Sequence, residues 1–442
     1  MTGDSNAAVK VIGAGLAGCE AAWQLAQREI PVELFEMKPG EKSPAHISPH
    51  FAELVCSNSL RSNELTNAVG LLKAEMRLLG SLIISAADET RIPAGGALAV
   101  DRERFAALVS ERIKKHPLIK VKEEIVREIP EGRVIIATGP LTSNGLAENI
   151  SKLSPDKKML SFFDAAAPII TSESIDMGNA FFASRYDKGD ADYINCPLSK
   201  EQYIKLYKAL ISADIVPARG FEDKTVFEGC MPIEAMAKRG EDTIRFGPLK
   251  PVGLIDPATG KEPYAVVQLR KDNSEGTLYN LVGFQTSLKF PEQKRIISMI
   301  PALVNADIVR YGVMHLNTYI DSPRILDRFY RFIQDKRISF AGQITGVEGY
   351  VESAASGLLN GLETAREIHG LPPVMFSGET AIGALALYVS TGSVSDFQPM
   401  NINFGIIKPL DIKVKGKRNK NLAIAERSLK LIENIKSMPS YT

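Results

Sequence analysis

Val9-Lys-Val-Ile-Gly13-Ala-Gly-Leu-Ala-Gly18 opens the stretch, ending at Met37, that decides the fold. Residues 8–12 predict a short buried strand, and the three spaced glycines follow it at once. A helix is predicted over 19–28, with small apolar side chains on one face, and a second strand over 32–36. Strand, glycine turn, helix and strand in this order match the GxGxxG fingerprint of dinucleotide-binding folds.

The three glycines have separate predicted roles. Gly13 makes the tight turn, Gly15 lets a pyrophosphate approach the backbone, and Gly18 lets the helix pack closely on the strand. The helix N-terminus then offers backbone N–H groups and a partial positive charge to the phosphates. The predicted cofactor-binding residues of this turn are Gly13, Ala14, Gly15, Leu16, Ala17 and Gly18.

Glu36 ends the second predicted strand, 18 residues after Gly18. A carboxylate at this place can accept hydrogen bonds from both ribose hydroxyls of a dinucleotide. It would also repel a 2′-phosphate, so NADP is disfavoured at this site. The stretch alone fits FAD or NAD, and the alternative is a glycine-rich turn that binds nothing.

A second strand-and-glycine unit late in the chain favours FAD. A strand over 337–341 runs into Gly342-Gln-Ile-Thr-Gly346, and a helix is predicted from about Tyr350 to His369. FAD is long enough to need two contacts with one domain, and such a turn offers an anion site to its flavin end. A strand over 133–137, ending in Thr-Gly139, returns the chain towards the nucleotide. These features add Gly139, Gly342, Gln343, Ile344, Thr345 and Gly346 to the predicted cofactor site.

Between these two units the residue pattern of the sequence changes. Alternating strands over 264–270 and 277–285 predict a hairpin, and helices are predicted over 200–212 and 292–299. We therefore predict an α/β fold, in which an inserted α+β domain interrupts a Rossmann-like FAD-binding domain of the glutathione-reductase type. The predicted boundaries are 1–140 for the first part of the FAD-binding domain, 141–330 for the inserted substrate domain, and 331–442 for the return segment and C-terminal helices.

The composition of the chain limits the kinds of partner and compartment that we expect for the protein. The 442 residues carry a net charge of +1, so a nucleic acid would have to be held by local patches rather than by a global field. Four cysteines without CxxC or zinc spacing indicate a reducing compartment and no metal site. The first residues lack a signal-peptide pattern, and no apolar run is long enough to span a membrane. We expect a cytoplasmic protein.

Four motifs resemble those of one family. They are Gly13-Ala-Gly15-Leu-Ala-Gly18-Cys-Glu20, Leu54-Val-Cys56-Ser-Asn58-Ser-Leu-Arg61, Phe227-Glu-Gly-Cys230-Met-Pro-Ile-Glu234 and Phe340-Ala-Gly342-Gln-Ile-Thr-Gly346-Val-Glu-Gly-Tyr350. From about residue 9 to 435 the chain is similar to the bacterial folate- and FAD-dependent tRNA (uracil-5-)-methyltransferases, the TrmFO family. The glucose-inhibited division protein A family shares the FAD domain and carries a further helical domain.

This resemblance implies methylation of C5 of the T-loop uridine (U54) of tRNA. Methylenetetrahydrofolate would supply the carbon, and NADH or NADPH would reduce the bound FAD. The implied partners are the T-arm of tRNA and folate, and the sequence is compatible with a monomer. The rival hypotheses are an FAD-dependent oxidoreductase acting on a small molecule, a related flavin enzyme that modifies the tRNA wobble uridine, and a flavoprotein that binds RNA as a chaperone.

Cys56 and Cys230 are the predicted catalytic residues. Uracil C5 is a poor nucleophile until a thiolate adds at C6, and a base must later remove the C5 proton. Cys56 precedes helix-capping residue types and lies near Arg61, which suits a lowered pKa. We assign Cys56 as nucleophile and Cys230 as general acid/base, although the reverse order fits the sequence nearly as well. Inert buried thiols are the alternative, and we accept it for Cys19 and Cys196.

Substrate contacts are predicted at two further places. His315, Asn317, Tyr319 and Tyr350 are candidates for stacking on the pterin, although each alone is more typical of a core or surface position. The basic run Lys413–Lys420, with Lys417 and Arg418 at its centre, could bind tRNA phosphates. The alternative for this run is a solvated tail before the last helix.

Overall fold

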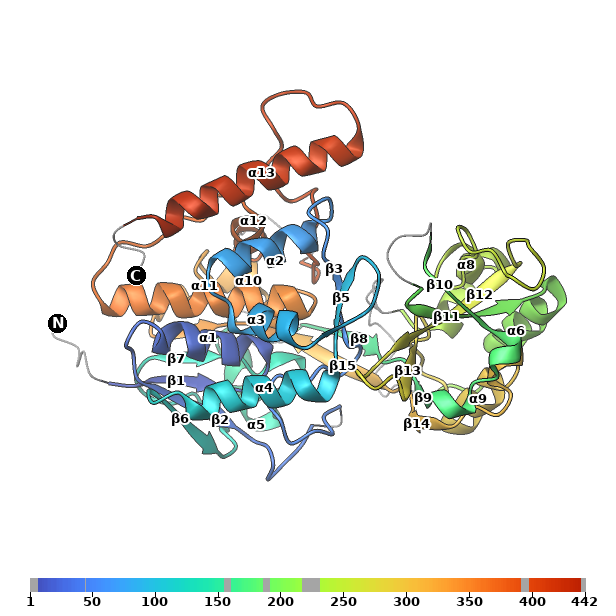
Figure 1. Cartoon of the computed structure of the whole chain (residues 1–442). Coiled ribbons are helices and arrows are strands. Elements are labelled where there is room, and N and C mark those ends of the chain that lie inside the picture. The colour runs from blue at the N-terminus through green and yellow to red at the C-terminus, as the bar shows by residue number, and fades with distance from the viewer. Residues whose placement is uncertain are drawn as a thin grey trace.

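A computed structural model describes residues 7–43, 45–154, 160–185, 191–216, 231–390 and 397–438. The chain forms a larger and a smaller lobe (Figure 1). The larger lobe contains a five-stranded parallel sheet of order β16-β7-β1-β2-β6. Its strands are β1 (Val9–Ile12), β2 (Val32–Glu36), β6 (Ile119–Glu123), β7 (Val134–Ile136) and β16 (Ile338–Phe340).

The smaller lobe is built on a six-stranded antiparallel sheet of order β10-β11-β12-β13-β9-β14. Its strands are β9 (Ile169–Thr171), β10 (Phe181–Ala183), β11 (Tyr193–Leu198), β12 (Ala265–Lys271), β13 (Leu278–Leu281) and β14 (Ile308–Arg310). Two small antiparallel sheets lie between the lobes (Figure 1). They pair β8 (Leu160–Ala165) with β15 (Met314–Tyr319), and β5 (Ala97–Val100) with both β3 (Ser59–Ser62) and β4 (Arg91–Ile92).

Helices surround both sheets. In the larger lobe they are α1 (Leu16–Ala26), α2 (Ala68–Leu78), α3 (Leu82–Glu89), α4 (Arg102–Lys115), α5 (Asn144–Ser151), α10 (Ser322–Ile325), α11 (Tyr350–Ile368), α12 (Ala381–Tyr388) and α13 (Lys417–Lys436). In the smaller lobe they are α6 (Lys200–Ser212), α7 (Ile233–Lys238), α8 (Glu241–Phe246) and α9 (Phe290–Ile297).

Two separate hydrophobic cores correspond to the two lobes. The first contains residues from 9 to 150 and from 319 to 435, and the second contains residues from 170 to 303. The interruption of one core by another supports an inserted unit. The predicted boundaries at 140 and 330 remain a proposal, and helix α5 and the segment around Tyr319 pack with the first core.

The predicted βαβ unit differs from the structure in its helix. Helix α1 begins at Leu16, three residues before the predicted start, because it opens directly from the glycine turn. It ends at Ala26 instead of residue 28, and Glu29 takes a positive φ of 61° that reverses the chain. The sequence did not predict helix α3 or the small sheet of β3, β4 and β5, whose strands are too short to show a clear alternation.

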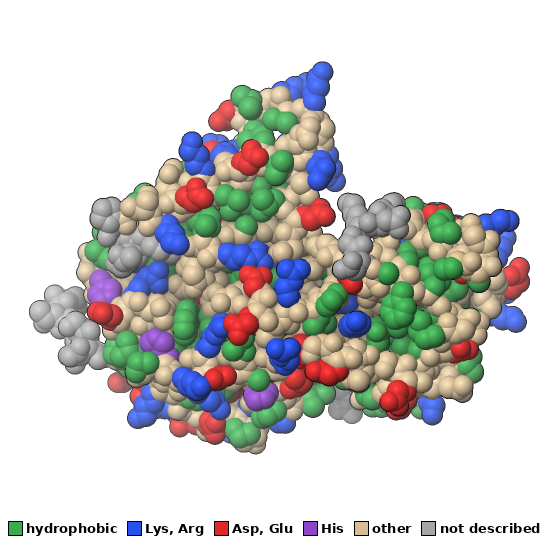
Figure 2. Space-filling view, viewed as in Figure 1, with side chains coloured by type: hydrophobic (Ala, Val, Ile, Leu, Met, Phe, Trp, Pro, Cys, Tyr) green, Lys and Arg blue, Asp and Glu red, His purple; other side chains and the backbone are tan. Residues whose placement is uncertain are grey.

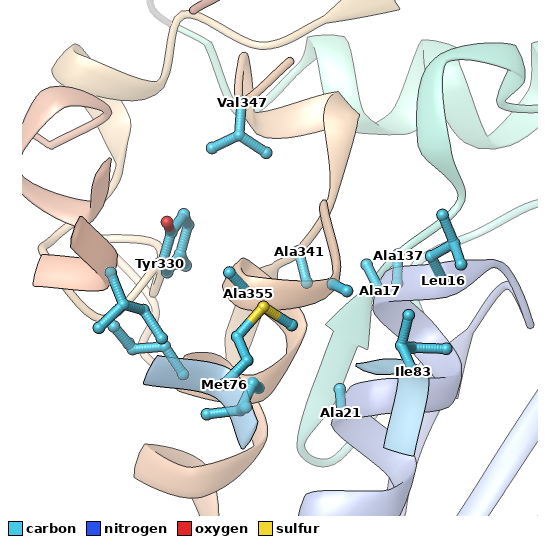
Figure 3. Close-up of a cluster of buried hydrophobic side chains, with 14 of the residues drawn as sticks. Leu16, Ala17, Ala21, Met76, Ile83, Ala137, Tyr330, Ala341, Val347 and Ala355 are labelled. Carbon is cyan, nitrogen blue, oxygen red and sulfur yellow. The ribbon is translucent and has the colours of Figure 1, made fainter. Parts of the chain in front are cut away.

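Helix α11 packs directly on α1. A Cβ on Gly357 would lie 2.2 Å from the carbonyl oxygen of Ala17, and one on Gly361 would lie 2.6 Å from that of Ala21. The small residues of α11 therefore pack on the backbone of another helix. Figure 3 shows small side chains of the glycine turn, β7 and β16 gathered in one buried cluster, among them Ala17, Ala137 and Ala341.

Glu75 joins three helices of the larger lobe. It lies on α2, is fully buried, and accepts hydrogen bonds from the backbone N–H groups of Ala381 (2.7 Å) and Ile382 (2.8 Å) at the start of α12. The hydroxyl of Ser428 on α13 also donates to it. Burial raises the pKa of the Glu75 carboxyl from 4.5 to about 7, although these hydrogen bonds act in the opposite direction.

This raised pKa predicts a loss of stability as the pH rises. The unfolded chain releases the Glu75 proton near pH 4.5, whereas the folded protein keeps it to about pH 7, so the contribution present below pH 4.5 is lost between these values. The loss is on the order of 3 kcal/mol. In Glu75→Gln this pH dependence should disappear. Urea unfolding at several pH values tests it, and a difference between wild type and variant that stays constant with pH would contradict it.

Candidate functional site at the junction of the two lobes

A deep cleft crosses the C-terminal edge of the five-stranded sheet. It is lined by the glycine turn, the end of β2, the segment 137–143 and the start of α11. Ligands of open α/β sheets bind beyond the carboxyl ends of the strands. Of the predicted cofactor residues, Gly13, Ala14, Gly15, Leu16, Ala17, Glu36, Gly139, Gly342 and Gln343 line this cleft.

The glycine turn has the geometry of a phosphate-binding turn. Gly13 has a φ of +96°, and a Cβ there would lie 2.7 Å from the carbonyl oxygen of Ala137. A Cβ on Gly18 would lie 1.8 Å from the carbonyl oxygen of Gly13, so Gly18 is needed for packing and does not reach the cleft. A Cβ on Gly15 would meet no atom within 4 Å. Open space at Gly15, beside the first turn of α1, is what a pyrophosphate needs.

Glu36 is buried at the end of β2 and holds the turn in place. Its Oε2 accepts a hydrogen bond from the Ala14 N–H (2.8 Å), and its Oε1 accepts one from the Lys38 N–H (3.0 Å). Each carboxylate oxygen has a second lone pair, so both remain able to accept from ribose hydroxyls. The predicted ribose ligand therefore also shapes the phosphate turn.

The return turn after β16 offers fewer backbone donors than its sequence predicts. The Gly342 N–H donates to Ser356 Oγ (2.7 Å), and those of Thr345 and Gly346 donate within the turn. Among the described residues of this turn, only the N–H groups of Gln343 and Ile344 lack a protein acceptor. Ile344, Thr345 and Gly346 do not line the cleft, because Gly346 packs against the Phe397 ring instead.

Cys56 lies beside the end of the cleft formed by Val55 and Tyr350. Its side chain is partly exposed, and its N–H donates to the Tyr350 hydroxyl oxygen (2.7 Å), as does that of Ser57 (3.2 Å). Tyr350 is the first residue of α11, so the return segment anchors the cysteine loop. Burial, together with the nearby Cys56, raises the pKa of the Tyr350 phenol well above its usual value.

The cation beside Cys56 is not the one that the sequence indicates. Arg61 pairs with the buried carboxylate of Glu352, which neutralises its charge. The Arg102 guanidinium instead donates to the carbonyl of Leu54, two residues before Cys56. The residues Ser57 to Ser59 cap no helix, since strand β3 begins at Ser59.

The smaller lobe holds the cysteine loop from its other side. Arg270 on β12 donates to Asn58 Oδ1 (3.0 Å) and to Ser57 Oγ (2.7 Å). Asn58 is fully buried, and its amide donates to the carbonyls of Val100 (2.9 Å) and Lys271 (2.8 Å). Sequence reasoning missed Arg102, Arg270 and Asp272. Charged residues at and just after the end of the first strand of the predicted hairpin, Arg270 and Asp272, were the only signal that could have indicated two of them.

The other predicted site residues lie in several places. Cys230 lies outside the described residues, as does the side chain of His315, whose backbone pairs with Asp164. Asn317 and Tyr319 are buried, and Tyr319 packs against Phe397 with ring centroids 6.0 Å apart. Cys19 and Cys196 are fully buried, which raises the pKa of both thiols.

Lys417 and Arg418 are exposed in the first turn of α13, far from the cleft. Within the described part of the chain, no group of three His, Cys, Asp or Glu side chains could hold a metal ion. No helix among these residues is long and apolar enough to cross a membrane.

Comparisons with known proteins agree with this geometry. A family model described as glucose inhibited division protein A matches residues 8–372. A methylenetetrahydrofolate--tRNA-(uracil-5-)-methyltransferase TrmFO of Acetivibrio thermocellus is 59% identical over 426 residues, covering 96% of this chain and 98% of that protein. The chain belongs to the TrmFO family. TrmFO proteins of Bacillus licheniformis and Bacillus subtilis are 58% and 57% identical, and each alignment covers 97% of this chain and 99% or 98% of theirs.

A solved structure shows the same fold as this TrmFO family member. Aquifex aeolicus GidA in its form II crystal superposes with a TM-score of 0.71 at 16% identity. The match covers 98% of this chain and 74% of that chain. This confirms the predicted flavoprotein architecture, a Rossmann-type α/β domain with an additional domain. FAD is the cofactor of this family, and the open approach at Gly15 together with the return turn fits its two-ended binding.

Glu36→Lys should purify largely without flavin. The change removes the ribose acceptor and the two hydrogen bonds that hold Ala14 and Lys38. The ratio of flavin to protein absorbance measures it. Glu33→Lys is the matched control, because Glu33 lies on the same strand and pairs with Lys122 at the surface. If Glu36→Lys keeps full flavin occupancy, the ribose lies elsewhere.

Proposed function

We propose that the protein methylates C5 of the T-loop uridine in tRNA, with methylenetetrahydrofolate as carbon donor and FAD reduced by NADH or NADPH. Its relatives carry this activity in their names. One observation supports it most directly: Cys56 lies at the end of the dinucleotide cleft, where Tyr350 fastens its loop to the return helix. A thiol at this place can reach a base brought to the flavin end.

The residues of the chain have separate tasks. The glycine turn and Glu36 would bind the cofactor, and Gln343, which lines the cleft, would offer it a backbone N–H group. When bound, FAD supplies one-carbon transfer and electrons. Cys56 adds to C6 of the uracil or removes the C5 proton, and Cys230 performs the other step.

Nothing favours a small-molecule oxidoreductase or an enzyme acting on the wobble uridine. A redox role would need the two cysteines to form a pair. In the described part of the chain, the loop of Cys56 is hydrogen bonded to groups of both lobes. Because tRNA is the substrate, we propose that the protein acts in the cytoplasm. A monomer remains compatible with the site, since Cys56 and the cofactor cleft belong to one chain.

The basic run Lys413–Lys420 supports a tRNA contact. Lys and Arg side chains gather at the tip of the arm formed by α13 and its preceding loop (Figure 2). Three of these cations lie in the first turn of α13, which has no acidic residue. Cations are unfavourable at the positive end of a helix dipole, and a phosphate would relieve that repulsion.

The methyl carbon should come from methylenetetrahydrofolate and not from S-adenosylmethionine. A methylene group needs two more electrons to become methyl, so methylation should require both the folate and a reductant. Labelled carbon on each donor in turn, followed by analysis of digested tRNA for 5-methyluridine, decides the source. Cys56→Ala should abolish transfer and leave the flavin spectrum and NAD(P)H oxidation close to wild type. Label arriving from S-adenosylmethionine would refute the proposal.

Replacing Lys413, Lys415, Lys417, Arg418 and Lys420 with Ser should weaken tRNA binding and flatten its dependence on salt. Each lost phosphate contact should lower the slope of log K against log salt by about one. Lys430→Ser with Lys436→Ser is the control, since both are exposed on the far half of the same helix. An unchanged slope in the fivefold variant would assign the run to a solvated surface.

A further inference from the structure

The loop of Cys56 lies among buried cations that no step proposed above uses. Arg102 and Arg270 are only 6% and 7% exposed, and both donate to the loop 54–58. Burying a guanidinium is unfavourable unless its surroundings compensate it. Two such groups at one short loop therefore need an explanation.

Arg102 has the stronger connection to the thiol. Its Nη2 and Nε donate to the two oxygens of Asp272 at 2.8 and 3.2 Å, and Nη1 donates to the Leu54 carbonyl. Burial alone would lower the pKa of Arg102, but Asp272 raises it, and negative charge at Cys56 adds to that rise. The hydrogen bond to the Leu54 carbonyl places the guanidinium against the loop two residues before Cys56.

The position of Arg102 in its helix is locally unfavourable. It is the first residue of α4, where the helix dipole repels a cation. A buried cation at this end conflicts with both the dipole and desolvation. Such local conflicts are expected at functional sites, where another requirement outweighs stability.

Asp272 brings the smaller lobe into this arrangement. It follows β12 directly in the hairpin, and the neighbouring Ser274 donates through its N–H (2.9 Å) and hydroxyl (2.7 Å) to Asp101, the N-cap of α4. The hairpin thus contacts two adjacent residues at the start of α4: Asp272 pairs with Arg102, and Ser274 donates to Asp101. Arg102 keeps its position only while this hairpin contacts the start of α4.

Among the described residues, the charged groups around Cys56 leave an excess of positive charge. Tyr350 stays neutral because burial raises the pKa of its phenol. Glu53, from the loop itself, pairs with Lys38 at 3.7 Å. Arg310, on β14, is a further cation of this region: burial lowers its pKa, and the nearby charge of Arg102 lowers it further. With Arg270 also present, Asp272 is the carboxylate that directly offsets the guanidinium of Arg102.

We propose that Arg102 is a positioning residue that keeps Cys56 ionised, and that Asp272 of the smaller lobe holds it in place. The proposal rests on the proposed function only in that Cys56 acts as a thiolate, which both orders of the two cysteines require. Ionisation releases the thiol proton to solvent, and the guanidinium favours the remaining negative charge. The contact between the hairpin of the smaller lobe and α4 thereby controls the reactivity of Cys56.

Two variants separate the charge of Arg102 from its structural role. Asp272→Asn breaks the ion pair and keeps the cation, whereas Asp272→Asn combined with Arg102→Gln breaks the same pair and removes the cation. Arg102→Gln alone would leave the buried carboxylate of Asp272 without a compensating charge. The double variant avoids this, because it removes both charges. Iodoacetamide alkylation of Cys56 in the FAD-loaded protein, followed by peptide mass spectrometry over a range of pH, compares them.

At pH 7 the double variant should alkylate about tenfold more slowly than Asp272→Asn, and its pH midpoint should move about one unit to alkaline pH. Arg77→Gln with Asp88→Asn should match wild type, since that pair has the same forked geometry away from Cys56. Identical profiles for the two Asp272 variants would overturn the proposal. Alkylation uses neither tRNA nor folate, so its outcome is independent of the methylation assay.

Discussion

The backbone contact between α1 and α11 is the constraint on which the rest of the larger lobe depends. Gly357 and Gly361 lie against the carbonyls of Ala17 and Ala21, so any side chain at either glycine would force the helices apart. The N-terminus of α1 faces the phosphates, and that of α11 carries Tyr350 to the cysteine loop. Because the two helices are fixed at such short range, both ends of the cofactor cleft are fixed relative to each other.

The reactive loop belongs fully to neither lobe. Its first part is hydrogen bonded to α4 and α11 of the larger lobe, and Ser57 and Asn58 are bonded to β12 of the smaller one. A site at such a junction can respond to a large substrate that touches both lobes, because small shifts between them change the contacts of the loop.

Local patterns in the sequence predicted much of the fold and cofactor cleft. The GxGxxG turn, Glu36, helix α6 over Lys200–Ser212 and the β12–β13 hairpin all rest on neighbouring residues, whose spacing carries the information. The surroundings of Cys56 could not be predicted in the same way. Arg102 and Asp272 are separated by 170 positions, and Arg61, which is close in sequence, is neutralised by Glu352. Contacts between residues far apart in the sequence decide which cation can act on Cys56. A single sequence does not show these contacts.

The sheet order β16-β7-β1-β2-β6 has a consequence for biosynthesis. Strand β16 and helix α11 complete the cofactor cleft, yet they follow the whole smaller lobe in the chain. On the ribosome the first 150 residues emerge with the small-residue face of α1 uncovered, and the smaller lobe can fold before that face is closed. A nascent chain arrested before α11 would lack Tyr350 and Ser353 of the cleft, and the carbonyls of α1 that contact Gly357 and Gly361 would be uncovered.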